Sequence, residues 1–396
     1  MGTDTVLRAP RPSLPRRGWP VQPTAALVGL TLCLWIPVLS APLTSDEGGF
    51  LLVAAQWHAG GTSLYGDYWV DRPPVLILIF ALAHLCGGAV ALRVLGCLCA
   101  VASILLSQAV GTRLTGNRAA GLAAALVTTA LLATPLFDSF QVDGELVALP
   151  WVYAGLLAAC SAYSRASVRA SNRTMFRWAA AGALGAVAAL IKQNVVDVVV
   201  FVALLLTCAR LVGERSTRSV LTSAAAFTGG AAVVALATLA LASTRDTTPP
   251  GLWDALVTFR AEAGRVIADS ASPATHARFV GLALALASSG GAALGLLSLG
   301  LVLRRPARPA RLAPPRRPWQ RCWCGRASGS WVVAAIGCTT SSGWFPVSRS
   351  ERRCWWPLRG GSAGPPGRPW ATSRSQPWWA SPSWACTLRP RSGRAP

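Results

Sequence analysis

The chain has 396 residues, of which 53% are hydrophobic and 13% are charged, and its mean hydropathy is +0.44. This composition excludes an intrinsically disordered chain and an ordinary soluble domain. The net charge of +22 does not predict a nucleic-acid partner, because residues 304–396 alone hold 17 Arg against a single acid.

Apolar runs dominate the first three quarters of the chain. Runs of about 20 residues, the length that crosses a bilayer, recur from Thr24 to Leu303. They predict an all-α fold, a polytopic membrane helix bundle of about eight spans plus juxtamembrane helices in the first external loop. The predicted parts are a cytoplasmic N-terminal segment at 1–23, a transmembrane domain at 24–303 that includes the first external loop at 44–90, and a basic tail at 304–396.

Arginine indicates the sidedness of these spans, since cytoplasmic loops collect Arg and Lys. Four Arg precede the first run and place the N-terminus in the cytoplasm. A secretory signal peptide is the weaker interpretation, because further spans follow and no small-residue cleavage site precedes the next acidic residues.

The apolar run at 73–86 has only 14 residues, and if it crossed the membrane, Arg113 and Arg118 would lie outside. We therefore predict that it lies along the outer face or re-enters. The predicted spans are 24–43, 91–112, 119–137, 145–163, 176–192, 194–213, 219–243 and 279–303.

This threading places eleven of the 15 acids on the external side. The segment 244–278 is external as well, although it carries four Arg. Its spaced apolar residues predict a helix in the membrane interface, and we assign it no catalytic role.

Acids adjoin two of the predicted spans. Asp46 and Glu47 directly follow the first span, and Asp143 shortly precedes a later one. A structural interpretation makes Ser45 or Asp46 a helix N-cap with Glu47 in the first turn, and Asp143 an N-cap in a solvated loop. A functional interpretation is also open, because acids at a membrane boundary are costly unless solvated, paired or functional. The only lysine, Lys192, ends a span as either a snorkelling side chain or a phosphate contact.

Several short motifs between residues 20 and 300 carry a family resemblance. They are Asp46-Glu47-Gly48, Gly60-Gly61, Leu64-Tyr65, Asp71-Arg72-Pro73-Pro74 and Ala91-Leu92-Arg93-Val94-Leu95. The series resembles the integral-membrane glycosyltransferases of the C superfamily (GT-C), in particular the protein O-mannosyltransferase and aminoarabinose-transferase clan and its RgtA-like branch. In that clan an external loop carries the Asp-Glu pair, followed by membrane-parallel helices with the Pro-Pro motif.

The resemblance also implies roles for individual residues. Asp46 would be the catalytic base with Glu47 as its motif partner, and Asp143 would orient the acceptor or help to bind a divalent cation. Asp46 and Asp143 are the candidate metal ligands, although no spacing demands a metal. The remaining implied site residues are Arg93 and Lys192 at the donor phosphate, and Asp71, Arg72 and Tyr65 in the substrate loop.

The implied reaction moves a sugar from a polyprenyl-phosphate donor to a hydroxyl of a glycan, lipid or protein acceptor. It would occur at the external face of the plasma (inner) membrane, by a single displacement that inverts the anomeric centre. A transporter and a non-catalytic membrane scaffold are the alternatives. A transporter is expected to show internal repeats and broken spans, whereas here Asp197 is the one clear midspan acid and Gly229-Gly230 the one break.

The tail at 304–396 differs in composition from the rest. It holds ten of the 17 Trp and 14 of the 28 Pro, and disordered tails are poor in aromatics. Reverse translation of 338–347 in a shifted frame resembles the His-Tyr-(x)3-Leu-x-Pro stretch found late in the clan. We interpret the tail as frameshifted between Leu303 and Cys322, with no stable fold and with closing spans lost, which is expected to impair activity. A basic tail that docks on anionic cytoplasmic lipid is the alternative.

Overall fold

The computed structural model describes residues 22–134, 140–165, 171–270 and 273–288. Almost all of the predicted N-terminal segment, the second part of the last predicted span and the whole tail at 304–396 lie outside these ranges. Contacts divide the chain into the units 1–346 and 347–396, and every described residue belongs to the first.

Every regular element among the described residues is a helix, which confirms the predicted all-α class. In chain order the helices are α1 (Gln22–Leu39), α2 (Ser45–Ala55), α3 (Pro74–Leu85), α4 (Ala89–Thr115), α5 (Arg118–Ala133), α6 (Gly144–Arg165), α7 (Asn172–Ile191), α8 (Asp197–Leu211), α9 (Thr217–Ser243), α10 (Pro249–Trp253), the π-helical turn η2 (Asp254–Thr258), α11 (Phe259–Ser270) and α12 (Pro273–Ser288).

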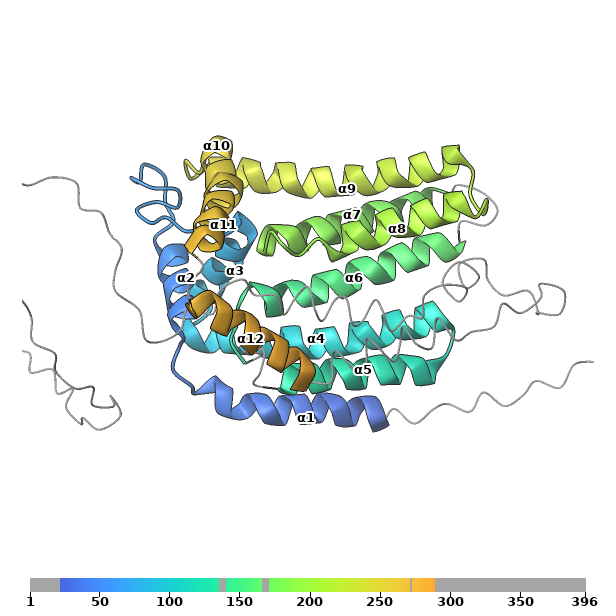
Figure 1. The fold of residues 1–396 in the computed structure, drawn as a ribbon, viewed down its shortest axis with the longest axis horizontal. Helices are drawn as coiled ribbons and strands as arrows, with labels where there is room; N and C mark the ends of the chain where they lie inside the picture. Colours follow the sequence, from blue (N-terminus) through green and yellow to red (C-terminus); the bar gives the residue numbers. More distant parts are fainter. Residues whose placement is uncertain (1–21, 135–139, 166–170, 271–272, 289–396) are drawn as a thin grey trace, which may run out of the picture. The chain divides into compact units, whose positions relative to one another are not determined.

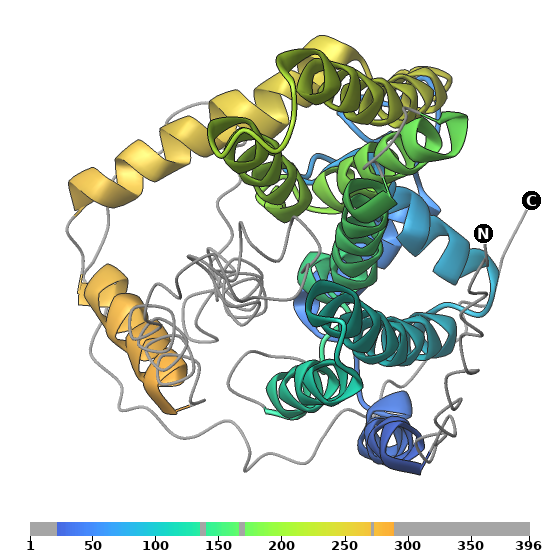
Figure 2. The same ribbon diagram turned by 90° about the vertical axis from the view of Figure 1, so that its right-hand side faces the viewer.

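Helices α1 and α4 to α9 run side by side as a bundle (Figures 1 and 2). Helix α4 packs against α1, α5 and α6, and α7 packs against α6, α8 and α9. Four described helices are long and apolar enough to cross a membrane: α4, α6 over Gly144–Ser164, α7 and α9. The predicted membrane helix bundle is confirmed to this extent, and the full set of eight crossings stays a prediction.

Small residues let two of these helices approach closely. A Cβ added to Gly182 of α7 would lie 1.8 Å from the carbonyl oxygen of Phe227, and one added to Gly230 of α9 would lie 1.9 Å from that of Ala179. Small residues at such crossings are typical of membrane helix packing, because they allow backbones into van der Waals contact. Helix α9 runs unbroken through Gly229-Gly230, so the break considered in the sequence is a packing position.

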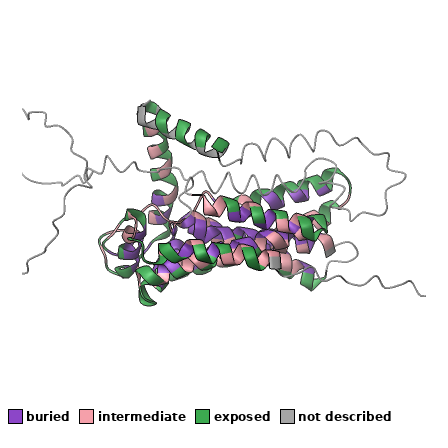
Figure 3. Ribbon diagram, turned by 90° about the horizontal axis from the view of Figure 1, so that it is seen from below, coloured by how far each residue is buried: buried purple, intermediate pink, exposed green. Residues whose placement is uncertain are grey.

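Buried residues lie on the inside of the bundle and exposed ones on its outside (Figure 3). The outside carries many large apolar side chains, including Ile36, Leu98, Leu221, Val233 and Leu236, which are all at least 60% exposed. In water such a surface would promote aggregation, whereas lipid tails solvate it. The burial pattern therefore agrees with a bundle whose solvent is the bilayer.

Helices α2 and α3 gather at one end of the bundle with α10 and α11 (Figure 1), and this end is named the α2–α3 end below. The 73–86 run forms the 12-residue helix α3, with Pro74 in its first turn and no side-chain cap. Two glycines with positive φ, Gly87 and Gly88, then separate α3 from α4. Only glycine adopts this geometry without strain, so the Gly pair turns the chain into the bundle.

A joint between two distant loops completes the α2–α3 end. The indole N–H of Trp57 donates to Thr247 Oγ1 at 2.9 Å, and the Thr247 hydroxyl donates to the carbonyl of Leu64 at 2.7 Å. The guanidinium of Arg245 lies over the Trp57 ring, 5.0 Å from its centroid. This joint, made by Trp57, Leu64, Arg245 and Thr247, fixes the segment that leads into α11 against the loop after α2.

Candidate functional site

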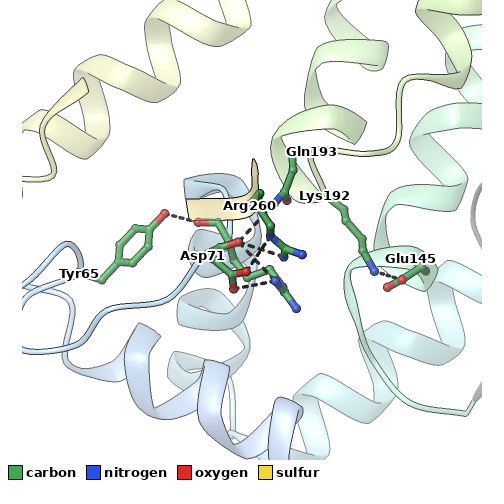
Figure 4. Close-up of polar contacts among 7 residues, drawn as sticks. Tyr65, Asp71, Glu145, Lys192, Gln193 and Arg260 are labelled. Atoms are coloured by element: carbon green, nitrogen blue, oxygen red, sulfur yellow. Dashed lines mark hydrogen bonds and ion pairs between the residues drawn. The ribbon is translucent and has the colours of Figure 1, made fainter. Parts of the chain in front are cut away.

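Charged side chains of both signs converge at the α2–α3 end, on elements far apart in sequence. Figure 4 shows Asp71 from the loop before α3, Glu145 from α6, Lys192 from the end of α7 and Arg260 from α11. We call this set, together with Arg72, Asp46 and Asp143, the polar cluster. Three groups of contacts build it.

Glu47 lies behind the cluster and is held entirely by the protein. One of its carboxylate oxygens accepts from the guanidinium Nη1 of Arg93 at 2.5 Å and from the backbone N–H of Val142 at 2.7 Å. The other accepts from the N–H of Thr44 at 2.8 Å. The Glu47 and Arg93 side chains are 1% and 3% exposed. Such a buried pair is stabilised when its remaining polar positions are also bonded; here every one of them is, except Arg93 Nε, which has no hydrogen-bond partner among the described residues.

Arg93 completes this buried contact set. Its guanidinium also donates to the carbonyls of Pro42 at 3.0 Å and Phe140 at 3.1 Å. It thus joins α4 to the loops before α2 and before α6. The lipid-phosphate role implied by the resemblance would compete with these partners, so the structure gives Arg93 a bracing position.

The N-cap of α2 is Thr44, and the prediction of Ser45 or Asp46 at that position is wrong. The Thr44 hydroxyl accepts from the Glu47 N–H, while the Glu47 carboxylate accepts from the Thr44 N–H, a reciprocal capping box. This box orients the first turn so that Glu47 faces the protein. Its neighbour Asp46 is exposed and, among the described residues, accepts a hydrogen bond from the Ser45 hydroxyl alone, at 3.4 Å.

Asp143 and Lys192 form the second group. The Asp143 carboxylate caps α6 by accepting from the Leu146 N–H at 3.0 Å, which confirms the N-cap interpretation. The residue is half-buried, and the loss of solvent raises the pKa of its carboxyl while Lys192 opposes that rise. The negative charge of Asp46 raises this pKa further. Asp46 and Asp143 therefore lie close enough to act on each other.

Lys192 caps the end of α7 and reaches across to the start of α6. Its ammonium pairs with Glu145, and its stem packs on Gly144, where an added Cβ would lie 3.2 Å from Lys192 Cδ. The pKa of Lys192 is lowered to about 8, chiefly by burial; Asp143 and Asp46 oppose this shift, and Arg72 and Arg260 contribute to it. These contacts make Lys192 a compact cation held inside the structure, rather than a side chain that snorkels to the membrane surface.

In the third group, Asp71 pairs with the guanidiniums of Arg72 and Arg260. Its carboxylate lies 2.8 Å from Arg72 Nη1 and 2.7 Å from Arg260 Nε. The Tyr65 hydroxyl donates to the backbone carbonyl of Arg72 at 2.6 Å and holds this part of the loop. Burial raises the pKa of that phenol, so Tyr65 is a neutral structural donor at physiological pH.

Arg260 is the site residue that the sequence interpretation missed, because the segment 244–278 was given no role. A second contact supports its placement: the Phe259 ring meets the Trp69 ring edge to face, with centroids 4.7 Å apart. One sequence signal could have found it. Arg on the predicted external side goes against the positive-inside rule, and an exception to that rule indicates a local partner or function.

Among the described ranges, no three His, Cys, Asp or Glu side chains come together as a metal site. Asp46 and Asp143 offer two carboxylates, which suffice for Mg²⁺ only where water and substrate phosphate complete its shell, and which fall short of the six to eight oxygen ligands of Ca²⁺. The described residues therefore supply no complete protein site for the divalent cation left open by the resemblance. Lys192 already supplies positive charge beside Asp143.

The structure thus brings Asp46, Asp71, Arg72, Asp143 and Lys192 to one end of the bundle, with Arg260 added. Glu47 and Arg93 lie behind them, and Tyr65 supports the loop. The comparisons with known proteins found no matching family model, no matching curated protein and no matching solved structure. Interpretation of the site therefore depends on its own geometry and on the motifs.

Proposed function

We propose that the chain is an integral-membrane glycosyltransferase that moves a sugar from a polyprenyl-phosphate donor to an acceptor hydroxyl. The polar cluster carries the proposal, because its Lys192 cation lies within electrostatic reach of an exposed carboxylate, Asp46, and of the guanidiniums of Arg72 and Arg260. The reaction needs both: a base for the acceptor and positive charge for the leaving phosphate. In this proposal the α2–α3 end faces outward and the eight predicted spans thread the membrane.

The membrane setting supports this pairing of groups. The polyprenyl chain of the donor stays in the hydrocarbon region, while its charged sugar-phosphate head is excluded from it. The two therefore separate at the boundary, where the bundle helices end and α2, α3, α10 and α11 lie (Figure 1). Arginines lie at the opposite end of the bundle, as expected for the cytoplasmic side. They stand near the ends of α4 and α8 and at the starts of α5 and α9.

Asp46 is the general base in this mechanism. It takes the proton of the acceptor hydroxyl as that oxygen forms a bond to the anomeric carbon. The bond between the anomeric carbon and the phosphate oxygen breaks at the same time, and its electron pair leaves with polyprenyl phosphate. Attack opposite the leaving group inverts the anomeric centre.

Lys192, Arg72 and Arg260 stabilise the charge that develops on the leaving phosphate. Arginine presents a planar fork of donors that matches phosphate, and lysine acts as a compact point charge. The carboxylates of Asp71 and Glu145 hold these cations in place before the donor binds. Asp143 interacts electrostatically with both the base, Asp46, and the phosphate-binding cation, Lys192. It therefore links the acceptor side of the cluster to the donor side.

Glu47 and Arg93 take supporting roles in the proposal. Their buried pair positions the α2 first turn, so Asp46 is presented on the outer side of that turn. Arg93 is not one of the cations that the proposal assigns to the leaving phosphate. The acidic pair of the motif therefore separates into one reacting carboxylate and one positioning carboxylate.

The test is transfer of radiolabelled sugar from polyprenyl phosphate by membranes that contain the protein. Asp46→Asn is expected to abolish transfer without loss of protein from the membrane. The matched control is Asp67→Asn, because Asp67 is an exposed acid of the same predicted external loop and its side chain pairs with His58 at 3.3 Å, outside the polar cluster. Equal turnover of Asp46→Asn and wild type, or a product that retains the anomeric configuration, would refute the mechanism.

A parallel arm addresses the tail. Sequencing the coding DNA tests the frameshift interpretation, and a gene with the frame restored after Leu303 is expected to give higher transfer than the printed chain. The transporter alternative has less support: Asp197 starts α8 at the α2–α3 end instead of lying midspan, and α9 is continuous.

A further inference from the structure

Two amide side chains at the turn between α7 and α8 have buried oxygens that nothing bonds. Among the described residues, neither Gln193 Oε1 nor Asn194 Oδ1 has a hydrogen-bond partner. Leaving a buried polar atom unbonded costs about 1–3 kcal/mol. In native structures such an atom calls for an explanation, such as a bound water or ion, a strained conformation or a role in the chemistry of a site.

The turn does not need these amides for its own shape. Backbone bonds already close it, from the Val195 N–H to the Lys192 carbonyl at 2.9 Å and from the Val196 N–H to the Asn194 carbonyl at 3.1 Å. An apolar side chain at either position would fill the same space without an unbonded atom. A ligand that bonds the amides accounts for what the fold leaves unexplained.

The position of Gln193 relates it to the polar cluster. Its amide nitrogen reaches the backbone carbonyl of Asp71 at 3.4 Å, the carbonyl that Arg260 Nη2 approaches at 3.5 Å. Figure 4 shows Gln193 next to Lys192 and beside Asp71 and Arg260. Its amide therefore lies beside the cations to which the proposed function assigns the leaving phosphate, and Asn194 follows it in the same turn.

We propose that Gln193 and Asn194 form a subsite for the hydroxyl groups of the donor sugar. This rests on the proposed function and deepens it. The sugar is bonded directly to the phosphate, so its hydroxyls lie within a few ångströms of the bound phosphate oxygens. Each amide offers both a donor and an acceptor, which matches a hydroxyl, itself a donor and an acceptor.

The subsite would set the choice of sugar. An apolar pocket discriminates poorly between sugars that differ by one hydroxyl, whereas a site built to bond that hydroxyl rejects its absence by up to about 10⁴-fold. The donor, rather than the acceptor, is the ligand, because Lys192 and Arg260 adjoin Gln193 while the base Asp46 serves the acceptor.

The experiment uses purified full-length protein and synthetic undecaprenyl-phosphate donors that carry mannose, glucose, galactose or arabinose. With the best donor, Gln193→Leu is expected to lower kcat/KM at least about tenfold, the effect of one lost hydrogen bond. Affinity for undecaprenyl phosphate without sugar should not change. The matched control is Gln56→Leu, since Gln56 is an exposed glutamine at the end of α2.

Deoxy analogues of the best donor locate the contact. A donor that lacks the recognised hydroxyl should lose activity with wild type and lose little more with Gln193→Leu, because both changes remove the same bond. Thermal stability of the variant should stay close to that of wild type, since Leu removes both a buried unbonded oxygen and the long 3.4 Å bond from the Gln193 amide nitrogen to the Asp71 carbonyl. Asn194→Leu serves as the second variant and should respond to a different hydroxyl.

Each contrary result has a distinct meaning. Additive losses for every deoxy donor, a change confined to acceptor KM, or an activity loss matched by a lower melting temperature would overturn the subsite while sugar transfer by wild type stands. If neither the wild-type chain nor a chain with the frame restored after Leu303 binds or transfers any of these donors, the proposed function and the subsite both fail.

Discussion

The buried pair of Glu47 and Arg93 allows the two acids of one motif to be separated by experiment. Glu47→Gln keeps the size of the side chain but removes its charge and turns one acceptor into a donor. The amide would still accept from Arg93 or Val142, yet its NH₂ would face the Thr44 N–H or the guanidinium. Arg93 would then be a buried cation without a counter-charge.

The magnitude follows from this geometry. Removing one partner of a buried ion pair costs about 3–5 kcal/mol, because the remaining charge is desolvated and unpaired. For a bundle of this size the melting temperature should fall by on the order of 10 °C. Asp46→Asn, one residue away on the exposed side of the turn, should change the melting temperature by less than about 2 °C.

The assay is thermal unfolding of the purified protein in detergent, followed by tryptophan fluorescence, for both variants, for Glu47→Leu and Arg93→Met alone, and for the double variant Glu47→Leu/Arg93→Met. The double variant removes both charges together and should lose less stability than the two single changes added. A Glu47→Gln protein with the same melting temperature as wild type would refute the bracing role of the Glu47–Arg93 pair. So would an Asp46→Asn protein that melts as early as Glu47→Gln.

Three more outcomes are expected. The pKa of Lys192 is lowered to about 8, and the proposed phosphate contact needs its protonated form. Affinity for undecaprenyl phosphate should therefore be full below pH 7 and fall as the pH rises through 8 to 9, whereas Lys192→Arg should bind across this range. A wild-type affinity that is flat from pH 6 to 9.5 contradicts this. Arg260→Ala should weaken binding of the same lipid about tenfold, whereas Arg265→Ala, an exposed position on the same helix, should not; equal effects would argue against a specific role. Gly230→Ala should destabilise the bundle by about 1–3 kcal/mol, since its new methyl would strike the α7 backbone, while Gly229→Ala meets no atom within 4 Å and should be tolerated in the same melting assay.

Local features of the structure were readable from the sequence. Apolar runs predicted α1 and α4 to α9 because helix formation in lipid depends on the hydropathy of contiguous residues. The short Pro-bounded run became α3, as its length required. The capping box of α2 was also present as Thr44-x-x-Glu47, and choosing Ser45 or Asp46 as the cap overlooked it.

Features that depend on helix packing were beyond the sequence. Nothing in the motif Asp46-Glu47 says which acid turns inward, because that choice depends on where Arg93 and Val142 lie after the bundle forms. The approach of Arg260 to Asp71 joins residues 189 positions apart. Sequence patterns place residues on faces and at ends of helices, whereas pairings between elements follow from the path of the whole chain.

The joint between Trp57 and Thr247 has a consequence for how the protein is made. Its two partners are 190 residues apart. The loop after α2, which holds Trp57, therefore leaves the ribosome long before the segment that holds Thr247 and bonds to it. During that interval the bundle helices α1 and α4 to α9 can form one after another, while Asp71 is still without its partner Arg260. A nascent chain arrested before Thr247 should therefore expose Trp57 to protease or to thiol probes placed nearby, and protection should arise only when α10 and α11 have been synthesised.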